Sequence, residues 1–221
     1  MNADGKRARL AQGPESFAEA FKVSHETIHR LEAYSSLLER WQKTTNLVAP
    51  STLPQVWSRH FADSAQLSAL APKARLWLDL GSGGGFPGLV VAILRSGDPN
   101  FRMHLVESNQ KKCAFLGDVA RTAKALVDIH PMRIEQFAEN AQSLRADVVS
   151  ARALAPLPRL LELAEPFLRD ETRGLFLKGR KTDAEIKPAE ARWSFDYASH
   201  PSLTAEGARI VEIANLRRRS A

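Results

Sequence analysis

A cluster of glycines follows a short apolar segment in the first half of this 221-residue chain. Residues 76–80 are almost wholly apolar, and four of the next five residues, 81–85, are glycines. Glycine adopts positive φ without strain and leaves no Cβ between the backbone and a bound molecule. Four glycines in five residues exceed what a simple turn requires. The pattern therefore predicts a loop that cradles a ligand at the carboxyl end of a buried strand.

Two classes of ligand fit the spacing of this loop. Residues 83–88 match the G-x-G-x-x-G fingerprint of dinucleotide-binding proteins, whereas residues 79–85 match the acidic-x-G-x-G-x-G loop of methyltransferases. Pro87 lacks an N–H that a dinucleotide phosphate would need, and a carboxylate at Asp79 suits the cationic amino-acid end of S-adenosyl-L-methionine. We therefore expect S-adenosyl-L-methionine as the cofactor, with an NAD(P)-dependent oxidoreductase as the alternative. The contacts expected from this loop are Asp79, Gly81, Gly83 and Gly85.

A second acidic residue stands at the end of the next apolar segment. Glu107 follows residues 103–106 at the separation from the glycine loop that a nucleoside-binding fingerprint requires. A carboxylate at this point can accept hydrogen bonds from both ribose hydroxyls of an adenosine. Because both candidate cofactors contain adenosine, Glu107 predicts nucleoside binding without choosing between them.

An open parallel sheet is needed to bring these residues together. After Pro72, strand-like apolar segments alternate with helical patterns, which is typical of βαβ units. The expected strands are 75–80, 101–107, 125–130, 146–150 and 174–178, and the expected helices include 110–122 and 157–168. Residues 192–198 and 208–214 follow without a helix between them and predict an antiparallel pair. The fold class is therefore α/β, an open and mostly parallel sheet with a terminal antiparallel hairpin.

The region before the sheet reads as a helical extension. Ile28, Leu31, Leu38 and Trp41 recur on one face of a helix that Ser24 can cap. These apolar faces need a sheet to cover, so we expect one domain rather than two. The expected organisation is a flexible N-terminus at 1–15, a helical extension at 16–72, a methyltransferase domain at 73–216 and a basic tail at 217–221.

Composition narrows the class of protein. Hydrophobic residues make up 44% and charged residues 25%, as in ordinary folded proteins. The apolar run at 88–94 is too short to span a bilayer, and the N-terminal residues lack the apolar stretch of a signal peptide. A single cysteine, Cys113, excludes an internal disulfide and a cysteine-based zinc cluster, and we expect no metal site. We therefore expect a cytoplasmic protein without membrane contact.

The net charge of +6 favours a polyanionic partner, although it also suits a merely basic soluble enzyme. Lys43, Asn46, Arg59 and His60 precede the glycine loop and could grip RNA, and Lys178 could reach a phosphate. Each is equally consistent with an ordinary surface position. His60 and Asp63 stand three residues apart and are also explained as helical neighbours.

A series of motifs runs in one order over most of the chain. They are HFADS (60–64), LDLGSGGGFPG (78–88), ESNQKK (107–112), RIE (133–135), SARA (150–153) and LKG (177–179). Together they resemble the bacterial small-subunit ribosomal RNA guanine-N7 methyltransferase family, known as RsmG or GidB. GGGFPG combined with S-x-R-A is quite specific to this family. Glu107 departs from it, since many relatives have aspartate there, but either carboxylate can bind a ribose. The last forty residues match only loosely, and nothing is carried over there.

The resemblance implies a Rossmann-like class I methyltransferase that transfers a methyl group from S-adenosyl-L-methionine to N7 of a guanine in 16S ribosomal RNA. The partner would be 16S ribosomal RNA or the small ribosomal subunit, and the enzyme would act as a monomer. Phe86 would offer a face to the cofactor, Ile134 would pack on its adenine, and the backbone at Ile134 and Glu135 would bond the adenine edge. The implied cofactor contacts are Gly81, Phe86, Ile134, Glu135 and Arg152.

Arg152 has a further expected role, because it follows the fourth strand where the methyl group should meet the base. We expect it to be catalytic; the alternative is a structural salt bridge at the end of the sheet. Exocyclic amine methylation usually needs an Asp/Asn-Pro-Pro-aromatic cluster there, but residues 150–154 are SARAL. Methylation of a pyrimidine C5 needs a cysteine nucleophile, and Cys113 is expected to pack in a helix. Guanine N7 needs neither device. A non-catalytic RNA-binding module stays open as a further alternative.

Overall fold

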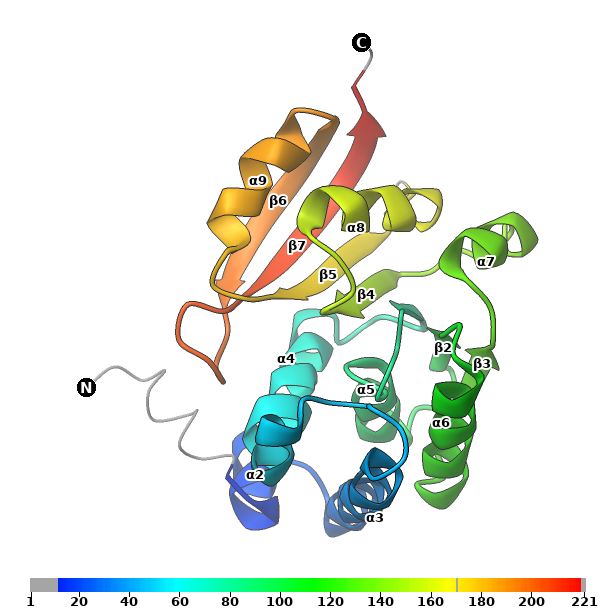
Figure 1. The fold of residues 1–221 in the computed structure, drawn as a ribbon, viewed down its shortest axis with the longest axis vertical. Coiled ribbons are helices and arrows are strands. Elements are labelled where there is room, and N and C mark those ends of the chain that lie inside the picture. Colours follow the sequence, from blue (N-terminus) through cyan, green and yellow to red (C-terminus); the bar gives the residue numbers. More distant parts are fainter. Residues whose placement is uncertain (1–11, 170, 220–221) are drawn as a thin grey trace.

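The computed structural model describes residues 12–169 and 171–219. Its centre is a seven-stranded sheet in the order β3-β2-β1-β4-β5-β7-β6 (Figure 1). The strands are β1 (Leu76–Leu80), β2 (Arg102–Val106), β3 (Val127–His130), β4 (Val148–Arg152), β5 (Arg173–Lys178), β6 (Trp193–Pro201) and β7 (Arg209–Arg218). The pairs among β1–β5 are parallel, and β7 is antiparallel to both β5 and β6. The predicted α/β fold with a terminal antiparallel hairpin is confirmed.

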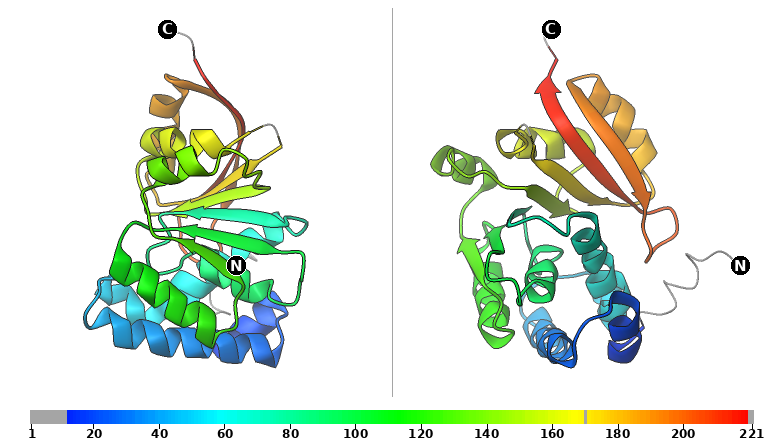
Figure 2. Two further views of the ribbon diagram at one scale, coloured as in Figure 1. Left: turned by 90° about the vertical axis from the view of Figure 1, so that its right-hand side faces the viewer. Right: turned by 180° about the vertical axis from the view of Figure 1, so that it is seen from behind.

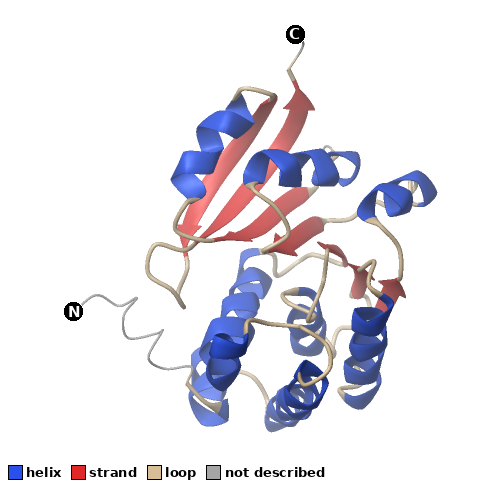
Figure 3. Ribbon diagram, in the orientation of Figure 1, coloured by secondary structure: helices blue, strands red, loops and turns tan. Residues whose placement is uncertain are grey.

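Helices cover both faces of this sheet, as the edge-on view in Figure 2 shows. One face carries α2 (Pro14–Phe21), α3 (His25–Gln42), α4 (Asp63–Leu70), α5 (Gly88–Leu94) and α6 (Gln110–Thr122). The other face carries α7 (Ile134–Asn140), α8 (Leu157–Ala164) and α9 (Thr182–Glu190). Shorter helical turns are η1 (Pro50–Gln55), the π-helical η2 (Trp57–Ala62) and η3 (Glu165–Phe167). Figure 3 shows the resulting layers of helix, strand and helix.

The N-terminal helices share a core with the first face of the sheet. Ser24 caps α3 by accepting a hydrogen bond from the Thr27 N–H, as its sequence position predicts. The apolar stripe of α3 buries Leu31, Tyr34 and Leu38 completely. They join one continuous cluster that also contains residues of α5, α6 and the sheet. The helical extension is therefore part of the same folded unit.

Strand alternation decides what β1 presents to each layer. Successive side chains of a strand point to opposite faces of the sheet. Trp77 belongs to the cluster beneath α5, whereas Leu78 and Leu80 belong to the cluster beneath α8. Asp79 shares the side of Trp77, which fixes the direction of its carboxylate.

The ends of the expected segments differ from the observed elements. Residues 1–11, most of the expected flexible N-terminus, lie outside the described residues, and α2 already begins at Pro14. The boundary expected at 217 lies inside a strand, because β7 continues through Arg218, which pairs with Trp193 and lies 5.2 Å from its ring centroid. Helix α9 was not among the expected elements. In the described ranges we find no helix of the length and apolarity needed to cross a bilayer.

Candidate active site

The glycine loop joins β1 to α5 with a tightly packed backbone. Gly81 has φ +65°, and a Cβ at this position would lie 2.6 Å from Cδ1 of Leu154. Gly85 has φ +85°, and a Cβ there would lie 2.5 Å from the hydroxyl of Tyr34. That hydroxyl donates a hydrogen bond to the backbone oxygen of Gly84. The positive φ therefore favours glycine at both positions, and at Gly85 the buried Tyr34 hydroxyl also leaves no space for a Cβ.

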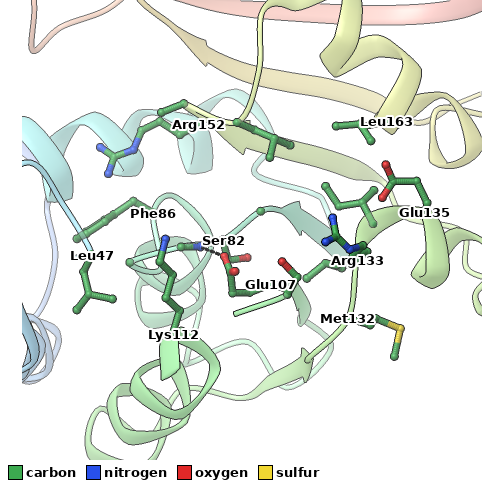
Figure 4. Close-up of a pocket in the computed structure, with 18 of the residues that line it drawn as sticks. Leu47, Ser82, Phe86, Glu107, Lys112, Met132, Arg133, Glu135, Arg152 and Leu163 are labelled. Carbon is green, nitrogen blue, oxygen red and sulfur yellow. Dashed lines mark hydrogen bonds between the residues drawn. The ribbon is translucent and has the colours of Figure 1, made fainter. Parts of the chain in front are cut away.

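A cavity of about 420 Å³ opens above this loop, at the carboxyl ends of β1, β2 and β4. Its volume lies in the range of about 300–1,000 Å³ that is usual for small-molecule sites. Figure 4 shows its walls converging from the glycine loop, β2, α7 and α8. The expected residues that line it are Gly81, Gly83, Phe86, Glu107, Ile134, Glu135 and Arg152.

Glu107 is held rigidly at the cavity wall by backbone amides. Its Oε2 accepts from the Gly83 N–H at 2.9 Å, and its Oε1 accepts from the Asn109 N–H at 2.8 Å. The bond from Gly83 ties the end of β2 to the glycine loop (Figure 4). Each carboxylate oxygen keeps a further lone pair, so both remain able to accept from hydroxyls of a ligand.

Two of the expected contacts do not reach the cavity wall. Asp79 is fully buried and accepts a hydrogen bond from the Ser150 hydroxyl at 2.7 Å, which in turn accepts from the Trp77 indole N–H. Its side chain points toward α5, because β1 alternates, and not toward the cavity. Burial raises the pKa of Asp79 to about 6, opposed by the hydrogen bond from Ser150. Gly85 faces Tyr34 instead of the cavity.

The two residues that open α7 present different groups to the cavity. Ile134 is the first residue of the helix and its apolar side chain is buried in the wall. The carboxylate of Glu135 pairs with Arg159 of α8 at 3.0 Å. Both members of this exposed ion pair line the cavity.

Phe86 and Arg152 form the end of the cavity nearest to the N-terminal helices. The Phe86 ring stacks on Tyr34 at 5.3 Å and on His60 at 4.8 Å between centroids. The Arg152 guanidinium lies 4.7 Å from the Phe86 centroid and donates to the backbone oxygen of Arg59 at 3.3 Å. Burial lowers the pKa of Arg152, yet the group stays charged because an arginine pKa is very high.

His60 is a neutral residue in this cluster. The Thr52 hydroxyl donates its one hydrogen to the Ala49 oxygen, so it must accept at 2.8 Å from the Nε2–H of His60. The Nδ1 atom then carries a lone pair, and it is buried without a partner among the described residues. Burial, together with the charges of Arg152 and Arg59, lowers the pKa of His60 to about 3. His60 therefore carries no charge near neutral pH.

A second and larger cavity, of about 940 Å³, adjoins the first. The residues that line both cavities are Leu47, Lys112, Arg152 and Ala153. The basic side chains of the second cavity are Arg59, Lys112, Arg152, Lys178, Arg180, Lys181 and Arg209, and its acidic side chains are Asp63 and Glu185. An excess of positive charge next to the first cavity suits a polyanion such as RNA.

Some residues that line this second cavity were named in the sequence analysis. Asn46, Arg59 and His60, which the sequence offered as candidate RNA contacts, line this cavity, whereas Lys43 does not. Lys178 also lines it, but its ammonium pairs with Glu185 at 2.6 Å and donates to a backbone oxygen. It is therefore less available to a phosphate than expected.

The sequence reasoning missed the turn between β6 and β7. Ser202 and Thr204 of this turn, and Arg209 at the start of β7, line the second cavity. The cluster of proline, serine, threonine and glycine at 201–207 signalled a turn, but no local pattern shows that it folds back toward Arg152. Lys112 was also given no role, although it stands in the ESNQKK motif.

Cys113 occupies a packing position, as expected. Its thiol donates to the backbone oxygen of Glu107, and it lies on α6 outside the residues that line the two cavities. Burial raises the pKa of the thiol, which disfavours the thiolate that nucleophilic attack requires.

The overall fold has several solved neighbours at low sequence identity. A putative O-methyltransferase from Klebsiella pneumoniae aligns with a TM-score of 0.61 at 14% identity, covering 95% of this chain and 99% of its own. An O-methyltransferase from Bacillus cereus in complex with SAH aligns with a TM-score of 0.56 at 16% identity, covering 81% of this chain and 91% of its own. At these identities the likeness concerns the fold alone.

Sequence comparison is more specific. The family described as rRNA small subunit methyltransferase G (GidB) matches residues 27–213. The ribosomal RNA small subunit methyltransferase G of Parvibaculum lavamentivorans is 50% identical over 203 residues, covering 91% of this chain and 89% of the relative. That of Methylorubrum populi is 50% identical over 196 residues, covering 89% and 92%. This chain therefore belongs to the rRNA small subunit methyltransferase G family.

Proposed function

We propose that this protein transfers the methyl group of S-adenosyl-L-methionine to N7 of a guanine in 16S ribosomal RNA. One observation carries the proposal: a nucleoside-sized cavity above the glycine loop shares Arg152 with a larger, basic cavity. Two adjoining sites meet the requirement of a transfer reaction, in which a donor and an acceptor must be held together.

The first cavity fits the cofactor in its residues. The space above Gly81 is kept by the absence of a Cβ, which would collide with Leu154. The oxygens of Glu107, fixed by two backbone amides, can accept from ribose hydroxyls. The apolar side chains of Ile134 and Leu163 line the wall near α7 and suit an adenine ring. Bound S-adenosyl-L-methionine would supply an electrophilic methyl group on a sulfonium.

Asp79 has a less direct role in this arrangement than the loop pattern suggested. Its carboxylate lies beneath the loop, where the Cβ of a residue replacing Gly88 would come within 2.8 Å of Oδ2. It therefore supports the start of α5 and contributes negative charge below the site. Gly85 leaves room for the Tyr34 hydroxyl, which holds the loop through the Gly84 oxygen.

The residues after β4 are compatible with the chemistry of N7. Its lone pair lies in the plane of the purine and carries no proton, so the transfer needs no general base. Arg152, Ala153 and Leu154 occupy the place where amine methyltransferases carry their acceptor cluster. The chain's main contribution is then to hold the base in line with the methyl group, and orientation of this kind can contribute about 7–11 kcal/mol.

Arg152 is the residue best placed to orient the base. It borders both cavities, and a guanidinium offers five N–H donors of which one is used on the Arg59 oxygen. N7 must remain free for the methyl group, so Arg152 would donate to the neighbouring O6 of guanine. The guanidinium lies over the Phe86 ring, which packs against it on one side. The protein would act as a monomer in the cytoplasm.

The test uses the whole protein with labelled S-adenosyl-L-methionine and two substrates, 16S ribosomal RNA and small subunits from a strain that lacks the enzyme. Nuclease digestion and mass spectrometry should then detect 7-methylguanosine. A methyl group on an exocyclic amine, on C5 or on ribose would refute the assignment. Transfer that requires the assembled subunit would identify the particle, not free RNA, as the substrate.

The two alternatives are separated by simple measurements. S-adenosylhomocysteine should raise the melting temperature of the protein, whereas NAD should not; the reverse would support an oxidoreductase. Binding of RNA without any transfer of label would support a non-catalytic RNA-binding module.

A further inference from the structure

Arg152 has an acidic neighbour on the side of the second cavity. Asp63, the first residue of α4, places its Oδ2 atom 3.7 Å from Nη1 of Arg152. The two side chains are 16% and 17% exposed, and both line the second cavity. Asp63 does not line the first cavity, whereas Arg152 lines both. The pair therefore stands at the entrance from the RNA side to the point where the cavities meet.

The two oxygens of Asp63 are used differently. Oδ1 accepts from the hydroxyls of Thr204 at 2.7 Å and Ser202 at 3.2 Å, and from the Gln66 amide at 3.3 Å. The bonds from Ser202 and Thr204 hold the β6–β7 turn against α4. Oδ2 faces Arg152 at a distance longer than the 2.7–3.2 Å of a hydrogen bond. The two groups thus form an ion pair without a direct hydrogen bond, so the Arg152 donors and the Oδ2 lone pairs can still bond to a ligand.

We propose that Arg152 and Asp63 read the edge of the target guanine, an inference that rests on the proposed function above. Around a guanine the polar groups follow in the order N7 acceptor, O6 acceptor, N1–H donor and 2-amino donor. Around the site the order is the first cavity, then the Arg152 donors, then the Asp63 acceptor. With N7 toward the first cavity, Arg152 donates to O6, and Oδ2 of Asp63 accepts from N1–H and the 2-amino group.

This pairing explains how the site rejects adenine. Adenine presents an amino group where guanine has O6, and a lone pair where guanine has N1–H. Each would oppose a group of like character, the amino group against Arg152 and the lone pair against Asp63. A polar site built for one hydrogen-bonding pattern discriminates strongly, because the mismatched base leaves buried groups unpaired.

The other carboxylate of the second cavity is committed elsewhere. Oε2 of Glu185 pairs with the Lys178 ammonium and accepts from the Leu157 N–H, each at 2.6 Å. These contacts tie α9 to β5 and α8. Asp63 is therefore the acidic group that the structure leaves open beside Arg152.

The experiment is a double-mutant cycle that combines a change in the Asp63 side chain with removal of the 2-amino group from the target base. The methylated nucleotide is first mapped, and RNA with inosine at that position is then made by ligation. Inosine keeps N7, O6 and N1–H but lacks the 2-amino group. In wild-type protein this loss should lower kcat/KM about 10-fold or more, as expected for a hydrogen bond to a charged group. In Asp63→Asn the preference for guanine over inosine should disappear.

Asparagine at position 63 distinguishes recognition of the base by Asp63 from a role in which Asp63 only positions Arg152. Its amide oxygen can replace Oδ1 toward Ser202 and Thr204, which places an N–H₂ donor at the position of Oδ2. If Asp63 only positioned Arg152, the variant would lose activity equally on both substrates and keep the wild-type preference. The matched control is Thr204→Val, which removes a bond to Oδ1 but leaves Oδ2, and which should keep the preference for guanine.

The outcomes distinguish the two levels of the proposal. An equal guanine preference in wild type and Asp63→Asn, or no preference in wild type, overturns the guanine-reading pair while 7-methylguanosine still forms. Absence of 7-methylguanosine with wild-type protein overturns the proposed function itself. Binding of S-adenosylhomocysteine verifies that each variant is folded. If Asp63→Asn does not bind it, equal kcat/KM values for guanine and inosine in wild type still overturn the guanine-reading pair.

Discussion

Replacing Asp79 by asparagine should change how the stability of the protein depends on pH. Asp79 is fully buried beneath the glycine loop, and burial raises its pKa from 3.8 to about 6 even though Ser150 donates to it. The folded protein thus holds the proton more tightly than the unfolded chain does. The favourable contribution of the neutral carboxyl is complete below about pH 4 and is lost as the pH rises through 6. Asparagine keeps the acceptor for Ser150 and cannot ionise.

The size of the effect follows from the shift in pKa. A difference of about 2 pKa units, at 1.36 kcal/mol per unit, corresponds to about 3 kcal/mol. The free energy of unfolding of Asp79→Asn, relative to wild type, should therefore increase by about 3 kcal/mol between pH 4 and pH 7.5. Other ionisable groups act equally in both proteins and cancel in this difference.

Urea unfolding of both proteins at half-unit steps of pH measures this difference directly. Glu139→Gln, a loss of the same charge at an exposed position of α7, is the matched control and should give a flat difference. A difference between Asp79→Asn and wild type that varies by less than 1 kcal/mol across the range would refute the reasoning. Such a result would mean that the Asp79 carboxylate has water or a charged partner that keeps its pKa close to the value in the unfolded chain.

Three further predictions concern the site. Gly81→Val should abolish cofactor binding measured by calorimetry but change RNA affinity only a few fold, because a Cβ at φ +65° collides with Leu154; unchanged cofactor affinity would contradict the cradle. Arg152→Ala should lower methyl transfer about 100-fold, and Arg152→Lys should rescue it poorly, since an ammonium cannot replace a planar fork; full activity would return Arg152 to a structural role. The logarithm of the RNA association constant should fall with the logarithm of the salt concentration, with a slope of about −0.7 for each phosphate contact. A flat response would mean that the net positive charge of the protein does not contribute to RNA binding.

Local patterns predicted the elements that hold the first cavity. Strand β1 could be predicted because a strand buried in a parallel sheet is almost wholly apolar. The loop after it could be predicted because four glycines in five residues indicate a backbone that adopts positive φ or lies close to a ligand. Glu107 and Arg152 were expected at strand ends, and both line the cavity. Asp79 was assigned to the cofactor from the motif alone, although the alternation of β1 already places it on the side of Trp77.

Contacts between distant segments could not be predicted in the same way. Nothing near Gly85 in the sequence shows that Tyr34 occupies the space a Cβ would need. The second cavity is built from the N-terminal helices, the end of β5 and the β6–β7 turn, which meet only in the folded chain. The contacts of Asp63 could not be predicted either, because its partners Ser202 and Thr204 are 139 and 141 residues away in the sequence.

The hydrogen bond from Tyr34 to the glycine loop has a consequence for anyone who would shorten this protein. Tyr34 belongs to α3, stacks on Phe86 and donates to the oxygen of Gly84. A fragment that began at β1 would retain every glycine of the glycine loop but would lose the Tyr34 ring and hydroxyl that hold this loop in shape. It would also expose the apolar faces of α5 and α6 to water. The minimal unit for engineering or transplantation therefore starts at α3, well upstream of the motif by which the site is recognised.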